Sequence, residues 1–167
     1  MPHPTLGHPP HDITAGLPDA ATRLRASRKR IAQLALQRVV TNEDGFTDRY
    51  GEDVLRLFMR DYDRHIEQLA KSMETGEESY LTSYAEWLMP VYRRRRVPSH
   101  DLIVMLGALK RAASTVLSPE EQKLSELYLH NAMERVKHHQ RLPGDHKGNS
   151  VIRFFWKGAG VGDDKWI

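Results

Sequence analysis

Helical periodicity is the feature of this sequence that most constrains its fold. Apolar residues recur at helical spacing through most of residues 18–141, and no stretch alternates polar and apolar residues at period two. Helical spacing gathers apolar side chains on one face of a helix, whereas alternation would be typical of a strand. The sequence therefore predicts an all-α fold, a bundle in which helices joined by short connections bury their apolar faces against one another.

Turn-forming stretches divide this region into five expected helices. They cover about residues 18–40, 47–73, 80–96, 99–117 and 119–141, and Pro90 inside the third predicts a kink. Ser99 is expected to cap the fourth helix. Ser118, followed by a proline and two glutamates, is the clearest helix start in the chain.

The two ends of the chain differ in composition from the helical region. Residues 1–17 hold four prolines and three histidines, which predicts an extended arm. Residues 18–142 form the expected helical domain, and residues 143–167 form an irregular tail rich in glycine and aromatic residues. The tail carries Phe154, Phe155 and Trp156, and we expect this cluster to be covered by the bundle or by another chain.

The composition excludes several classes of chemistry. The chain has no cysteine, which rules out disulfides, thiolate metal sites and cysteine nucleophiles, and which fits a reducing cytoplasm. Because no signal-peptide core and no membrane-length apolar stretch is visible, we expect a soluble cytoplasmic protein that does not contact membranes. The net charge of +3 falls short of the positive charge typical of a nucleic-acid binder, although it permits an anionic partner.

Nothing in the sequence has the arrangement of a catalytic or metal site. No paired nucleophile and base, phosphate-binding loop or apolar carboxylate pair is visible, so we expect no catalytic residues and no enzymatic activity. His130, Glu134 and His138 have the spacing of ligands in carboxylate-bridged metal bundles. Helical geometry, however, turns His130 and Glu134 away from the apolar stripe of their helix, and we expect no metal site.

Two histidines do lie near apolar stripes. His65 falls near the apolar face of the second expected helix and His139 on that of the fifth. Histidines in such positions are mostly hydrogen-bonded core or boundary residues, which is the interpretation we favour. The alternative is that they hold a ligand between the helices.

Four consecutive arginines, Arg93 to Arg96, end the third expected helix. Cations favour a helix C-terminus, so the run is explained most simply as a charged helix end. An acidic protein partner and, less readily, a nucleic acid are the two alternatives.

The segment Tyr80–Leu117, "YLTSYAEWLMPVYRRRRVPSHDLIVMLGALKRAASTVL", resembles the F-to-G helix region of sensor-type globins and of the globin-related N-terminal domains of stressosome co-antagonist regulators. Haem-binding members carry a proximal histidine about six residues before the proline that corresponds to Pro98. Tyr92 stands in that place here. The resemblance, which covers about residues 50–141, therefore implies a haem-free domain.

This resemblance implies a non-catalytic sensory or regulatory module without a cofactor that acts through protein contact, as a dimer. The arginine run and the aromatic tail are its expected partner surfaces. One alternative is a sensor that binds haem, another tetrapyrrole or another apolar ligand through Tyr92, His65 and His139. The other alternative is a small structural subunit of a larger assembly.

Overall fold

The computed structural model describes residues 16–140, and this part of the chain is helical with no strand. The predicted all-α class is confirmed, while the expected arm and tail fall almost wholly outside the described residues. The elements are α1 (Pro18–Ala26), α2 (Arg28–Asn42), α3 (Phe46–Arg49), α4 (Glu52–Thr75), α5 (Ser79–Arg94), α6 (Ser99–Ala113), the 3₁₀ turn η3 (Ser114–Val116) and α7 (Pro119–Gln140).

The described residues form seven α-helices where the sequence predicted five. The first expected helix is divided at Ser27 into α1 and α2, and a short separate helix, α3, precedes α4. The division at Ser27 has a tertiary cause, because α1 packs against α4 whereas α2 packs against both α4 and α6. A straight helix over residues 18–40 could not make both sets of contacts.

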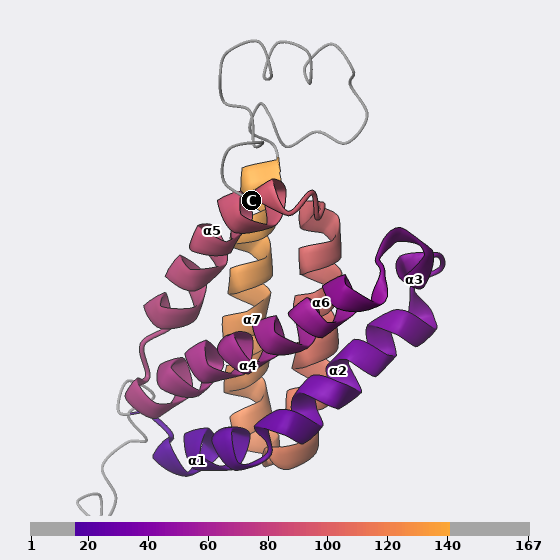
Figure 1. The fold of residues 1–167 in the computed structure, drawn as a ribbon. Coiled ribbons are helices and arrows are strands. Elements are labelled where there is room, and N and C mark those ends of the chain that lie inside the picture. The colour runs from indigo at the N-terminus through magenta and orange to yellow at the C-terminus, as the bar shows by residue number, and fades with distance from the viewer. Residues whose placement is uncertain (1–15, 141–167) are drawn as a thin grey trace, which may run out of the picture.

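The long helix α4 organises the bundle. It packs against α1, α2, α5 and α7, and it crosses in front of α7 in Figure 1. Behind it, α6 and α7 lie side by side, and α5 packs against both α4 and α7 (Figure 1). This arrangement places one face of α5 in the core and leaves another face on the outside of the molecule.

The core lies where α4 meets its neighbours. Its largest fully buried side chains include Phe46, Phe58, Tyr62 and Tyr92. Phe46, Tyr50 and Phe58 pack edge to face or tilted, with ring centroids 4.9 to 5.8 Å apart. Such contacts add to the free energy gained by burying the apolar area.

Local signals explain several helix ends. Helix α7 starts where the sequence predicts, and Ser118 and Glu121 form a reciprocal capping box there: the Glu121 amide donates to Ser118 Oγ and the Ser118 amide donates to Glu121 Oε2. The prediction for α6 was wrong in detail. Ser99 is its first helical residue, and the N-cap position belongs to Pro98.

The end of α5 is a Schellman motif built with an arginine. The Val97 amide donates to the Tyr92 carbonyl and the Arg96 amide to the Arg93 carbonyl, at 2.9 and 3.0 Å. Arg96 occupies the left-handed conformation, with φ of 59°, that glycine usually supplies at this position. Because Arg96 is not a glycine, it adopts this left-handed conformation at a cost in free energy.

Within the described range, no helix combines the length and the apolar character needed to cross a membrane.

Candidate functional site

A cluster of hydrogen-bonded polar side chains lies inside the bundle between α4 and α5. It consists of Asp61 and His65 from α4, Tyr84 and Tyr92 from α5, and Arg95 just after α5, and we call it the buried polar cluster. Asp61 and His65 are one helical turn apart, so both point from α4 toward α5. Asp61, His65 and Tyr92 are each at most 2% exposed.

The cluster is connected through short contacts. Tyr92 Oη donates to Asp61 Oδ2 at 2.9 Å, and Arg95 Nη1 donates to the same oxygen at 2.6 Å. Tyr92 Oη also lies 3.4 Å from His65 Nε2, and Tyr84 Oη lies 2.9 Å from His65 Nδ1. A buried carboxylate is therefore balanced by one guanidinium and one hydroxyl, which is how proteins keep such a charge inside.

Burial determines the protonation state of the His65 imidazole. Desolvation, reinforced by the positive charges of Arg95 and Arg64, lowers the pKa of His65 to about 3. Burial and the negative charge of Asp61 raise the pKa values of Tyr84 and Tyr92 above their usual range. At neutral pH the imidazole is thus uncharged and both hydroxyls keep their protons, so Tyr84 can donate to Nδ1 while Nε2–H faces the oxygen of Tyr92.

The structure brings together two of the three residues predicted for a ligand site. Tyr92 and His65 meet in the buried polar cluster, but His139 lies in the last turn of α7, with Nε2 4.0 Å from Glu86 Oε1 and about a third of its side chain exposed. Tyr92 is hydrogen-bonded to Asp61 and His65, and His65 to Tyr92 and Tyr84. A haem iron could reach either residue only after these hydrogen bonds were broken.

The four arginines of the run have different environments in the structure. Helix α5 ends at Arg94, so only Arg93 and Arg94 lie in its last turn. Arg95 turns inward to Asp61 and stands over the Tyr92 ring, with its guanidinium carbon 5.7 Å from the ring centroid. One of the four arginines predicted as a partner surface is therefore committed to the interior of the protein, while Arg94 and Arg96 are exposed.

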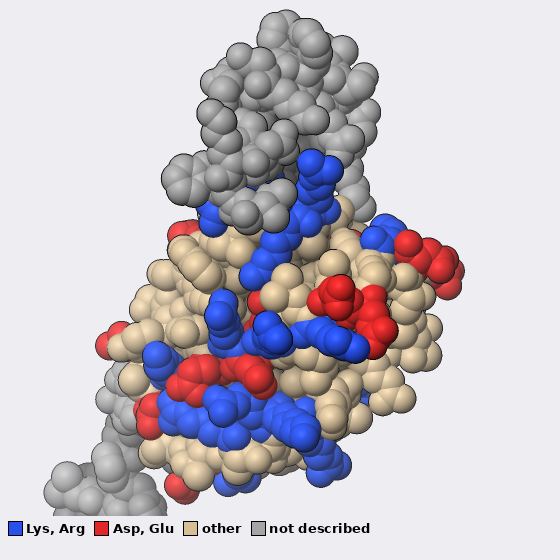
Figure 2. All heavy atoms as spheres, in the orientation of Figure 1, with Lys and Arg blue, Asp and Glu red and all other residues tan. Residues whose placement is uncertain are grey.

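Basic side chains elsewhere on the surface are interleaved with acidic ones. Figure 2 shows bands of Lys and Arg beside bands of Asp and Glu on one face of the molecule. Arg25 pairs with Glu67 and Glu74 at 3.1 and 3.0 Å, and thereby links α1 to α4. This face lacks the continuous positive surface that a phosphate backbone favours.

A second buried carboxylate joins the N-terminal part of the chain to α6. Asp101, in the first turn of α6 and 1% exposed, accepts a hydrogen bond from Tyr50 Oη and pairs with Arg49 Nη2 at 3.1 Å. Its place near a helix N-terminus favours the negative charge. This contact links two distant segments and explains why Tyr50 and Arg49 lie together.

The solvent-facing side of α5 is uncharged as far as Arg94, the exposed arginine in the last turn of the helix. Six residues share it at helical spacing, all of them exposed or half-buried, and we call them the α5 outer face: Tyr80, Ser83, Tyr84, Trp87, Pro90 and Val91. Tyr80 and Trp87 are 42% and 53% exposed, and the Trp87 ring stacks on Tyr84 with centroids 5.8 Å apart. The surface over α5 is mostly uncharged in Figure 2.

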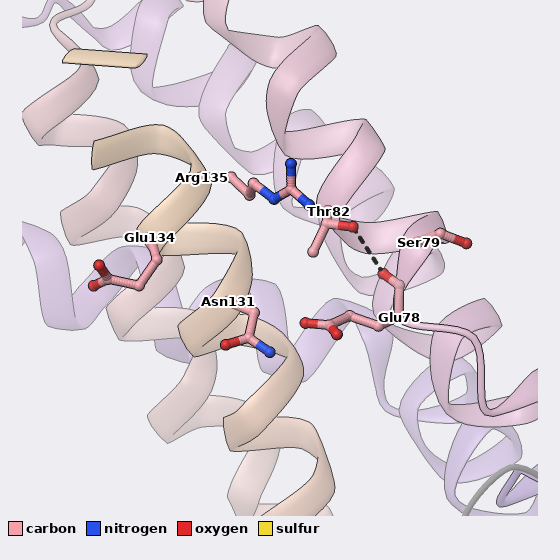
Figure 3. Close-up of a pocket in the computed structure, with 6 residues that line it drawn as sticks. All are labelled: Glu78, Ser79, Thr82, Asn131, Glu134 and Arg135. Atoms are coloured by element: carbon pink, nitrogen blue, oxygen red, sulfur yellow. Dashed lines mark hydrogen bonds between the residues drawn. The ribbon is translucent and has the colours of Figure 1, made fainter. Parts of the chain in front are cut away.

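A polar pocket opens between α5 and α7 (Figure 3). It has a volume of about 460 Å³ and is lined by Glu78, Ser79, Thr82, Asn131, Glu134 and Arg135. Glu78, Asn131 and Arg135 extend into the space between the helices, whereas Ser79 and Glu134 point away from it (Figure 3). The pocket and the α5 outer face lie on opposite flanks of the same helix.

Sequence reasoning missed Asp61 and Glu78 as site residues. Asp61 had a detectable signal, because it is a charged residue placed within the apolar face of α4, between Phe58 and His65. Glu78 had none, since it belongs to an acidic turn that reads as solvent-exposed. Phe154, Phe155 and Trp156 lie outside the described residues.

The fold and these sites define an all-α helical bundle with a buried polar cluster and an uncharged helix face. No protein-family model matches the chain, and a search of curated proteins finds no match. The resemblance to globin-related sensor domains stays a prediction.

Proposed function

We propose that this protein is a non-catalytic regulatory module that acts through protein–protein contact, and that it forms a homodimer through the α5 outer face. The observation that carries the proposal is the lack of charge on this face. Charged residues make up 28% of the chain, yet six consecutive positions of one solvent-facing helix surface carry none. Aromatic residues concentrate at protein interfaces and charged residues are depleted at interface centres.

The geometry of the face supports association with a second copy. In a symmetric dimer each α5 outer face would meet its own duplicate, so the absence of charge removes like-charge repulsion across the contact. Tyr84 is held from inside by His65 and from outside by the stacked Trp87 ring. Its side chain is therefore ordered before association and loses little conformational freedom on binding.

The test compares two charge-introducing variants on exposed apolar residues. Trp87→Lys places a cation at the centre of the α5 outer face, whereas Leu127→Lys places one on α7, where Leu127 is 51% exposed. We expect wild type and Leu127→Lys to sediment as dimers and Trp87→Lys to sediment as a monomer in analytical ultracentrifugation over a range of concentrations. Circular dichroism spectra serve as the control that all three proteins are folded.

Two results would contradict the proposal. One is a wild-type protein that stays monomeric at every concentration. The other is a dimer that both variants disrupt equally, which would mean that the contact lies elsewhere.

A further inference from the structure

The pocket between α5 and α7 contains a carboxylate oxygen that accepts no hydrogen bond from the described residues. Arg135 Nη1 pairs with Glu86 at 2.9 Å, and Glu134 pairs with Lys137 at 2.7 Å. Glu78 is different, because its Oε1 is buried and has no hydrogen-bond partner among the described residues. A buried acceptor without a donor costs free energy, and more so when it is charged.

The unpaired carboxylate does not serve the helix beside it. Glu78 occupies the N-cap position of α5, but its own side chain makes no capping hydrogen bond to that helix. Only its backbone carbonyl takes part, accepting from the amides of Leu81 and Thr82. The Glu78 side chain instead extends toward Asn131 on α7 (Figure 3).

The neighbouring groups complete a set of acceptors. Thr82 Oγ1 donates its proton to the Glu78 carbonyl at 3.3 Å, which leaves the lone pairs of this hydroxyl oxygen as acceptors. The Asn131 amide contributes a carbonyl oxygen from the opposite wall of the pocket. Carboxylate, hydroxyl and amide groups thus line one space, and the cation that extends into it, Arg135, is already paired with Glu86.

We propose that this pocket binds an alkylammonium group. Such a group carries three N–H donors and one positive charge on a narrow stem, which matches the three kinds of oxygen and the carboxylate oxygen that lacks a donor. The group could belong to a free small amine or to a lysine side chain of another protein, since both present the same chemistry. The pocket lies away from the α5 outer face, so this site does not depend on the proposed dimer.

The test uses n-butylammonium as the probe and an adjacent glutamate as the control. Glu78→Gln removes the charge with little change in shape, and Glu77→Gln makes the same change at an exposed neighbour. Binding is followed by ¹⁵N-resolved NMR titration of the full chain at constant ionic strength, with the Asn131 side-chain amide as a reporter in the pocket.

We expect n-butylammonium to bind wild type and Glu77→Gln equally, and Glu78→Gln about tenfold or more weakly, as the loss of one charge-assisted hydrogen bond implies. Tetramethylammonium, which has no N–H, should not shift the Asn131 signal. A titration with Nα-acetyl-lysine methylamide distinguishes the sources: tighter binding than n-butylammonium supports a lysine side chain, and weaker binding supports a free amine.

Three outcomes would overturn the proposal. They are no saturable binding of n-butylammonium to wild type, an equal loss of affinity in Glu78→Gln and Glu77→Gln, and binding of tetramethylammonium as tight as that of n-butylammonium. Glu78→Gln keeps the shape of the side chain and breaks no hydrogen bond of the buried Oε1, so it should fold about as stably as wild type, and a thermal melt checks this.

Discussion

Replacing Arg95 by methionine should destabilise the fold far more than replacing its neighbour Arg94. Arg95 Nη1 lies 2.6 Å from Asp61 Oδ2, and the Asp61 side chain is only 3% exposed. Removing one partner of a buried ion pair costs about 3 to 5 kcal/mol, because the remaining charge stays buried without compensation. We expect about 3 kcal/mol for Arg95→Met, at the lower end, since Tyr92 Oη still donates to Asp61 and the Arg95 side chain is 26% exposed.

Two comparison variants isolate the buried charge as the cause. Arg94→Met makes the same change of net charge at an exposed position, where substitutions usually alter stability by about 0.5 kcal/mol or less. The double variant Arg95→Met with Asp61→Asn removes the stranded charge while keeping an oxygen that can accept from Tyr92. It should therefore be more stable than Arg95→Met alone, by about 1 kcal/mol or more.

Urea unfolding followed by circular dichroism measures these differences. A domain of this size is stabilised by about 5 to 15 kcal/mol, so a loss of about 3 kcal/mol shifts the midpoint clearly. The reasoning is refuted if Arg95→Met and Arg94→Met unfold at the same urea concentration. It is refuted equally if the double variant is less stable than Arg95→Met.

Three further predictions follow from the same region. Because the pKa of His65 is about 3 in the folded protein and the ordinary histidine value is 6.5, the unfolded chain binds more protons between these pH values, so stability falls as the pH is lowered through this window. His65 contributes up to about 1.4 kcal/mol per pH unit to the pH dependence of the free energy of unfolding, and this contribution should disappear in His65→Gln. Urea melts that give wild type and His65→Gln the same pH dependence would contradict this. Arg96→Gly should be more stable than Arg96→Ala by about 1 kcal/mol in the same assay, because both remove the side chain and only glycine relieves the left-handed conformation; equal stabilities would show no strain there. Addition of haemin should give no stoichiometric Soret band, because Tyr92 and His65 are already hydrogen-bonded to each other and Tyr92 to Asp61. A stoichiometric band would contradict the haem-free interpretation.

The parts of the fold that depend on neighbours in the sequence were predictable. The all-α class, the start of α7 at Ser118 and the apolar environment of His65 all depend on residues within about one or two helical turns. His130 and Glu134 were placed on the solvent side of α7 by the same reasoning, and both are exposed. Period and capping are local properties, so one sequence is enough to find them.

The candidate sites could not be predicted, because they form between distant segments. Nothing around residues 93–96 distinguishes Arg95 from its three neighbours, and only the approach of α5 to α4 selects it as the partner of Asp61. Glu78 likewise acquires its unusual position only when α7 brings Asn131 alongside α5.

The sequence by itself determined that the chain folds into helices, where most of them begin and end, and which faces are apolar. Only the tertiary structure decided that the chain bends at Ser27, that Tyr92 meets His65 inside the bundle, and that the uncharged side of α5 from Tyr80 to Val91 stays open to solvent. The physical reason is that helix periodicity is set within a few residues. The pairing of faces depends on how distant helices pack, as the hydrogen bonds from residues 61 and 65 to residues 84, 92 and 95, which lie 19 to 34 residues away, show.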